Sequence, residues 1–156
     1  MKVLSTSRDK AVNPSRSPAF CESPAFRELA RAIESQARPV SLPPNCVLFR
    51  EGDPPKNLYL LKSGEVAFTL RACDRTVPCF TVSGVSLIGL SGIIAHIPFA
   101  LTATASPGAE ILRMESDAFV RLVESQTEWY MCVLRALADE TVRAHYALAE
   151  MLEAIS

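Results

Sequence analysis

The chain has little that could build a metal or catalytic centre. It contains two histidines, His96 and His145, and none of its five cysteines belongs to a Cys-x-x-Cys pair. Zinc fingers, iron–sulfur clusters and c-type haem attachment need such spacings, and a histidine-rich enzyme metal site needs at least one histidine more. No serine or cysteine has an evident base partner. We therefore predict a protein that is not an enzyme and has no metal or cofactor.

An excess of charge is also missing. The formal net charge is −1, so no overall attraction to nucleic acid or to a membrane surface is implied. The first ten residues have no apolar core, which excludes a signal peptide. The odd number of cysteines then indicates reduced thiols in the cytoplasm. Cys73 and Cys79 could face each other across a hairpin, but two separate free thiols are the favoured interpretation.

Glycine and proline divide the chain into regions. Residues 1–20 are rich in serine, proline and charge and are predicted to be a mobile tail, followed by one domain over 21–156. Ser23 and Pro24 have the pattern of a helix start. The apolar face of that helix repeats at helical spacing (Phe26, Leu29, Ala30, Ile33), and Pro39 stops it.

The central region has the punctuation of an all-β unit. All six glycines lie between Gly52 and Gly108. Short runs of strand formers separate the turns, at residues 46–49, 58–61, 66–70, 77–82, 86–88, 101–105 and 111–114. Many short strands at regular spacing predict a sandwich, barrel or jelly roll over about residues 39–114.

The C-terminal region is helical, because neither glycine nor proline follows Glu115. We predict a helix capped by Ser116 and ending near Glu124, then a long helix from about Thr127 to Ile155. A heptad-like seam with alternating spacings of four and three follows the long helix: Tyr130, Leu134, Leu137, Thr141, Ala144, Leu148, Met151 and Ile155. Two interpretations stay open: the seam packs on its own barrel, or part of it meets the same helix of a second subunit.

The stretch from Leu87 to Ala105 is the predicted ligand pocket. Its pattern is a strand, one helical turn and a strand, with Gly89 and Gly92 at the joints. The backbone N–H groups of such a turn attract anions. The uncharged run from Val85 is also about as long as a membrane span, but its glycines and Pro98 make a buried pocket the better interpretation.

Two motifs in the central region resemble a known family. They are Glu51-Gly52-Asp53, after a strand ending at Phe49, and Ser63-Gly64-Glu65-Val66, after Leu58-Tyr59-Leu60. At this spacing they resemble the cyclic nucleotide-binding domain of the catabolite-activator/fumarate-nitrate-regulator superfamily. The resemblance covers roughly residues 26–153 and implies an α+β fold, a β jelly roll with one N-terminal helix and C-terminal helices.

The phosphate-binding motif departs from the family pattern. Cyclic nucleotide binders resemble Phe-Gly-Glu-Leu-Ala followed by Pro-Arg-Ala-Ala-Thr, where the Glu holds the ribose and the Arg pairs with the phosphate. Here Leu90 stands for that Glu and Phe99 for that Arg, which disfavours a cyclic nucleotide. The predicted pocket residues are Ile88, Gly89, Leu90, Ser91, Gly92, Phe99, Ala100 and Thr102.

The resemblance implies a sensor or regulatory domain that signals by a shift of its C-terminal helices when the pocket fills. We expect a small-molecule effector, and a homodimer through Tyr130, Leu134, Leu137, Thr141 and Leu148. The alternatives are a ligand-free dimerisation domain or one that docks on a protein partner, and a cupin-like enzyme. The chain stops at Ser156, where the helix-turn-helix of the DNA-binding regulators would begin, so direct nucleic-acid binding is not expected.

Overall fold

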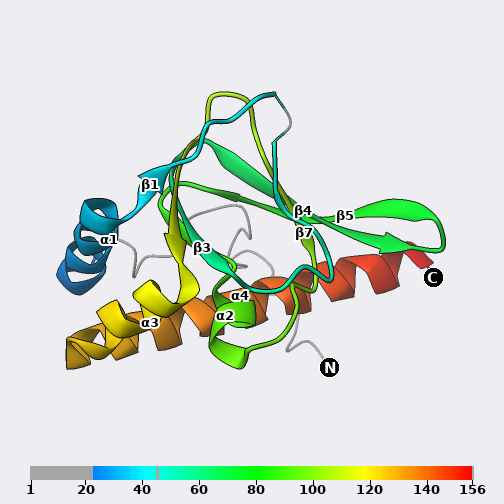
Figure 1. The fold of residues 1–156 in the computed structure, drawn as a ribbon. Coiled ribbons are helices and arrows are strands. Elements are labelled where there is room, and N and C mark those ends of the chain that lie inside the picture. Colours follow the sequence, from blue (N-terminus) through cyan, green and yellow to red (C-terminus); the bar gives the residue numbers. More distant parts are fainter. Residues whose placement is uncertain (1–22, 45, 156) are drawn as a thin grey trace, which may run out of the picture.

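The computed structural model describes residues 23–44 and 46–155, and the predicted tail, residues 1–20, lies outside them. The described residues form four helices and two four-stranded sheets (Figure 1). The helices are α1 (Pro24–Gln36), α2 (Leu90–Ala95), α3 (Ser116–Glu124) and α4 (Thr127–Ile155). The strands are β1 (Arg38–Pro39), β2 (Val47–Phe49), β3 (Asn57–Ser63), β4 (Glu65–Ala72), β5 (Arg75–Ser83), β6 (Ser86–Ile88), β7 (Thr102–Ala105) and β8 (Glu110–Glu115).

The sheets confirm the predicted jelly-roll-like α+β fold. One sheet has the order β1-β8-β3-β6 and the other β2-β7-β4-β5, and every pairing is antiparallel. All seven expected strands are present. The two-residue strand β1 was not expected, because Pro39 marks the end of a helix in the sequence. The β4–β5 hairpin extends beyond the barrel, beside the C-terminal part of α4 (Figure 1).

Strand β3 divides the hydrophobic core in two. Leu58 and Leu60 face the helices, whereas Tyr59 and Leu61 face the interior of the barrel. This alternation follows from the two-residue period of a strand. Both faces of β3 are buried, which explains its nearly continuous apolar sequence.

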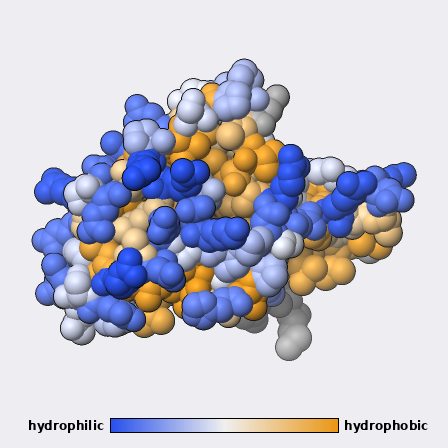
Figure 2. All heavy atoms as spheres, viewed as in Figure 1, coloured by the Kyte–Doolittle hydropathy of each residue, from blue (hydrophilic) through white to orange (hydrophobic). Residues whose placement is uncertain are grey.

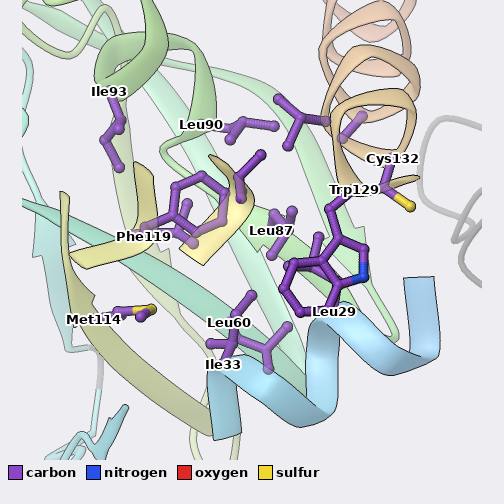
Figure 3. Close-up of a cluster of buried hydrophobic side chains, with 14 of the residues drawn as sticks. Leu29, Ile33, Leu60, Leu87, Leu90, Ile93, Met114, Phe119, Trp129 and Cys132 are labelled. Carbon is purple, nitrogen blue, oxygen red and sulfur yellow. The ribbon is translucent and has the colours of Figure 1, made fainter. Parts of the chain in front are cut away.

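The helix-side core holds the four helices against the first sheet. Figure 3 shows Leu29 and Ile33 of α1, Phe119 of α3 and Trp129 of α4 converging on this layer. Phe119 and Leu29 are fully buried. Burying a side chain of this size contributes about 1.5–3 kcal/mol, so this layer fixes how α4 lies across the barrel.

The helix starts differ in how well the sequence predicted them. The Ser23 hydroxyl accepts a hydrogen bond from the Phe26 N–H at 3.2 Å, which confirms the predicted cap of α1. For α3, the cap residue is Glu115 and the prediction of Ser116 was wrong. The Ser116 hydroxyl instead donates to the Pro55 carbonyl, and its N–H donates to the Lys56 carbonyl, so this serine joins α3 to the segment before β3.

The long helix spans Thr127–Ile155 as predicted, but the face it turns to the barrel differs from the predicted seam. The stripe on the barrel begins one residue earlier and keeps the same spacings of four and three: Trp129, Val133, Ala136, Glu140, Arg143 and Ala147. The first interpretation of the seam holds for its middle, where Leu137, Thr141 and Ala144 line a cavity of the domain, whereas the neighbouring stripe supplies most of the buried side chains. At the seam's outer positions, Leu134 and Leu148 stay more than half exposed.

Two expectations about local segments can be compared with the structure. The run Val85–Ala105 forms β6, α2 and β7, and no helix among the described residues is both long and apolar enough to cross a membrane.

Cys73 lies in the hairpin turn with φ +50°, and Cys79 lies at a register shift of β5. They are therefore not cross-strand neighbours, and both are free thiols.

Candidate functional site

A cavity of about 320 Å³ lies where strands of both sheets, the α2 segment and the middle of α4 meet. The strands and the α2 segment supply one set of lining residues: Phe49, Phe68, Phe80, Val82, Leu87, Ile88, Gly89, Ser91, Phe99, Ala100 and Leu101. Helix α4 supplies Leu137, Glu140, Thr141, Arg143 and Ala144. Most of the wall is apolar, and its charged groups both come from α4.

Phe99 occupies the position where the resemblance places an arginine. Its ring stacks on that of Phe49, with centroids 3.8 Å apart and planes at 21°. It also lies over the α2 turn: a Cβ on Gly89 would come within 3.1 Å of it, and one on Gly92 within 2.9 Å. The ring is buried at 7% exposure. The two glycines leave the space that this ring fills.

The Glu51–Gly52–Asp53 turn holds Phe99 in this position. The Gly52 N–H donates to the Phe99 carbonyl at 2.8 Å, and the Phe99 N–H donates to the Asp53 carbonyl at 3.0 Å. The Glu51 N–H donates to the Thr102 hydroxyl at 3.1 Å. Gly52 has φ +83°, a conformation that favours glycine. The motif that identifies the fold therefore also positions one wall of the cavity.

A second aromatic pair lies on the β4–β5 hairpin. Phe68 and Phe80 are direct cross-strand partners, and their rings stack with centroids 4.7 Å apart. Both rings line the cavity. Stacked aromatic pairs of this kind contribute about 0.5–1.5 kcal/mol beyond their buried area. The hairpin therefore supplies an aromatic wall as well as an edge of the sheet.

The charged groups of the cavity form a small cluster on α4. An Arg143 Nη2 nitrogen lies 3.0 Å from an Asp139 Oδ2 oxygen, and both side chains are largely buried. Glu140 is half-buried beside them, and its carboxylate accepts hydrogen bonds from the hydroxyl and the backbone N–H of Ser91. Helices α2 and α4 are thus joined by a polar contact at the cavity.

Burial raises the pKa of Glu140 to about 7. The Ser91 hydrogen bonds and the Arg143 charge oppose this rise by favouring the ionised carboxylate, whereas Asp139 adds to it. Burial also raises the pKa of Asp139, although Arg143 acts in the opposite direction. A carboxyl whose pKa lies near neutrality changes its charge within the ordinary working range of a protein.

The structure brings five of the eight predicted pocket residues to the cavity: Ile88, Gly89, Ser91, Phe99 and Ala100. Leu90 lies fully buried in the helix-side core instead (Figure 3), because the first turn of α2 directs it away from the barrel. Gly92 is buried against the Phe99 ring, and the Thr102 hydroxyl accepts the Glu51 N–H.

The predicted dimer residues fall into two groups. Tyr130, Leu134 and Leu148 are exposed at 47%, 57% and 56%. Leu137 and Thr141 line the cavity, and the Thr141 hydroxyl donates to the Leu137 carbonyl at 3.0 Å. The middle of the predicted seam therefore faces the domain's own pocket.

Sequence reasoning missed the contribution of Glu140 and Arg143 to the cavity. The signal available was a run of charges beside an apolar seam, which usually indicates a solvated face. A second signal, their place in a stripe shared with Trp129 and Val133, becomes meaningful only when that stripe is known to be buried. His96 caps α2 at φ +55°, and no cluster of metal-ligating side chains occurs within the described part of the chain.

Comparison with known proteins decides the family. The family model for the cyclic nucleotide-binding domain matches residues 39–126. The chain belongs to this family. The match confirms the resemblance indicated by the motifs at Glu51–Asp53 and Ser63–Val66, that is, to a cyclic nucleotide-binding domain of the catabolite-activator/fumarate-nitrate-regulator superfamily.

Curated relatives and solved structures agree with this assignment. The domain is 30% identical over 122 residues to the CRP-like cAMP-activated global transcriptional regulator of Mycobacterium tuberculosis, covering 78% of this chain and 54% of that protein. The chain thus spans about half the length of the curated relatives it matches.

Two solved structures share the fold. The catabolite activator protein of Thermus thermophilus superposes with a TM-score of 0.67 at 20% identity, covering 84% of this chain and 63% of that one. A cyclic nucleotide-binding domain from Methylobacillus flagellatus gives a TM-score of 0.67 at 23% identity, covering 81% and 72% of the two chains.

Proposed function

We propose that this cyclic nucleotide-binding domain is a non-catalytic sensor whose pocket has diverged from cyclic nucleotides and whose C-terminal helices carry the signal. The observation that supports this most directly is the position of α4, which supplies five residues of the cavity wall. A ligand that prefers one placement of α4 over another shifts the population of that placement. The occupancy of the cavity is thereby coupled to the end of the domain.

The chemistry of the cavity supports the divergence. The Phe99 ring fills the space beside the α2 turn, where the family places the phosphate. The side chain of Arg143 is engaged with Asp139, and Glu140 adds a second carboxylate. Leaving a phosphodiester without a compensating cation costs several kcal/mol, on the order of 2–7 for a polar group and more for a charge. Cyclic AMP, which the name of the mycobacterial relative gives as its activator, is therefore a poor fit.

Calorimetric titration of the full chain with cyclic AMP and cyclic GMP tests this proposal. We expect no binding at micromolar concentrations, and measurable binding by Phe99→Arg, which returns the family's cation. Phe99→Leu is the matched control, because it opens a similar space without adding charge. Leu90 is left unchanged, because a Glu at this fully buried position would threaten the fold. Micromolar binding by the wild type would overturn the proposed divergence.

A second candidate function, dimerisation or docking, is favoured by the outer side of α4. Large apolar side chains are exposed along it, including Tyr130, Met131, Leu134, Leu148 and Leu152. Apolar surface gathers where the β4–β5 hairpin and the C-terminal end of α4 lie (Figure 2). Exposed apolar patches of this kind mark interaction sites. We propose a second copy of the chain as the occupant, because the row lies on a helix with heptad spacing.

A further inference from the structure

The size of the cavity limits what it can hold. At about 320 Å³ it lies near the lower end of the range typical of small-molecule sites, about 300–1,000 Å³. Two stacked aromatic pairs, Phe49–Phe99 and Phe68–Phe80, form much of its wall. Flat aromatic walls favour a flat apolar ligand, because ring faces and edges pack well against each other. A compound of one or two rings fits these dimensions.

The charges around the cavity argue against an anion as the ligand. Asp139, Glu140 and Arg143 carry a net charge of −1 when all three are ionised, and Arg143 lies 3.0 Å from Asp139. The Glu140 carboxylate lines the cavity, accepts the Ser91 hydrogen bonds and lies within the electrostatic reach of Arg143, whose guanidinium is paired with Asp139. A ligand that donates one hydrogen bond complements this carboxylate, whereas an anion would be repelled.

We propose that the cavity binds an uncharged aromatic compound of one or two rings, with a single N–H or O–H group that donates to the Glu140 carboxylate. The inference rests on the proposed sensor function and names its ligand class. Ser91 of α2 already donates to this carboxylate, so a ligand that takes over part of that role changes the contact between α2 and α4. The Glu140 side chain would then both bind the ligand and hold α4 in place against α2.

A pair of probes tests the hydrogen bond directly. Indole has one N–H group, and 1-methylindole has the same ring system without a donor. Calorimetry or ligand-observed NMR with the full chain should show indole binding at least tenfold more tightly than 1-methylindole. Indole-3-acetate, which carries an anionic group, should bind more weakly than indole. Equal affinity for indole and 1-methylindole, or no binding of indole, would overturn the proposal.

A variant locates the donor contact. Glu140→Met keeps the length of the side chain and removes the acceptor, so the preference for indole over 1-methylindole should fall to about twofold or less. Glu150→Met, at an exposed position of the same helix, is the matched control and should keep the full preference. A preference that survives Glu140→Met in folded protein would overturn the assignment of the acceptor. The wild-type probe comparison stands even if this variant fails to fold.

The pH dependence gives an independent readout. A donor binds an ionised carboxylate more tightly than a neutral carboxyl, and Glu140 changes charge near pH 7 with Ser91, Asp139 and Arg143 facing it. The affinity for indole should therefore rise severalfold from pH 5.5 to 8.5 in the wild type and stay nearly flat in Glu140→Met. An affinity that falls over this range would contradict the proposed donor.

Two parallel measurements separate this inference from the sensor proposal. Hydrogen exchange of α4 is followed in the same titrations, and cyclic AMP is titrated alongside. Indole binding without any change in α4 exchange would refute the signalling proposal and leave the ligand class standing. Failure of indole, with cyclic AMP also failing to bind, would refute the ligand class and leave the divergence standing.

Discussion

The carboxylate of Glu140 in α4 accepts hydrogen bonds from the hydroxyl and backbone N–H of Ser91 in α2. This contact joins the α2 segment, which lines the pocket, to α4, the last helix of the described residues. It occurs beside the Asp139–Arg143 ion pair. The cavity therefore contains a titratable link between two elements that are far apart in the sequence.

The stability of the domain should depend on pH through Glu140. Its pKa rises from 4.5 to about 7 on folding, so the folded state holds the proton more tightly than the unfolded state. The stabilisation from this group is full below about pH 4.5 and is lost as the pH rises to about 7. Glu140→Gln should therefore be more stable than the wild type at pH 8, by about 1.4 kcal/mol or more, the equivalent of one pKa unit.

Urea unfolding between pH 4 and pH 8 measures this difference. The gain from Glu140→Gln should shrink toward zero at the acidic end, where the wild-type carboxyl is already neutral. Glu150→Gln, on the exposed side of α4, should differ from the wild type by a constant amount. A Glu140→Gln gain that did not vary with pH would contradict the buried, titrating carboxyl.

Gly64 and Gly52 form a matched pair for measuring how much stability the domain loses when a glycine gains a side chain. Both have positive φ, +92° and +83°. A Cβ on Gly64 would lie 2.7 Å from the Cα of Ala109, whereas a Cβ on Gly52 meets nothing within 4 Å. Gly52→Ala should cost about 1–2 kcal/mol from backbone strain alone. Gly64→Ala should cost clearly more, and chemical denaturation yielding equal losses would contradict the close contact.

Phe99 and Gly92 should be energetically coupled. A Cβ on Gly92 would lie 2.9 Å from the Phe99 ring, so Gly92→Ala should destabilise the domain while that ring is present. Phe99→Ala should itself cost about 3–5 kcal/mol, because the ring is buried. In the Phe99→Ala background, Gly92→Ala should cost less than it does in the wild type. A double-mutant cycle measures the coupling, and strictly additive effects would argue against the contact.

Self-association should depend on the exposed row of α4. Leu134 and Leu148 are more than half exposed, so Leu134→Asp with Leu148→Asp should convert a dimer to monomers without loss of the barrel's circular dichroism. Arg121→Asp, an exposed charge change on α3, is the control and should leave the dimer intact. Light scattering at high concentration gives the mass. A wild type that is monomeric under these conditions would remove the dimer proposal.

Much of the fold could be predicted because its signals are local. The Ser23–Pro24 start of α1, the span Thr127–Ile155 of α4 and the strand Ser86–Ile88 agree with the sequence predictions. The Glu51–Asp53 motif also indicated the family. It could be recognised in the sequence because the geometry of its turn depends on only a few adjacent residues. Ser116 was misassigned because its hydroxyl bonds to Pro55, a partner 61 residues away.

The pocket could be predicted only in part. The strand–turn–strand pattern predicted that Ile88, Ser91 and Phe99 lie together, and all three line the cavity. The pattern could not predict which way the Leu90 side chain points. Because of its position in the first turn of α2, this side chain packs in the helix-side core. The pattern also could not supply Glu140, which reaches the cavity from a helix about 50 residues further along the chain.

By itself, the sequence predicted the four helices and seven of the eight strands to within a few residues, and it indicated the family. It also places Leu90 and Phe99 where the resemblance expects the phosphate-binding pair. Only the tertiary structure decided which stripe of α4 meets the barrel. Two stripes, one starting at Trp129 and the other at Tyr130, share the same spacing and differ by a rotation of about 100°. Periodicity cannot distinguish them; the packing of Trp129 and Val133 into the helix-side core does. That choice turns Glu140 and Arg143 toward the cavity.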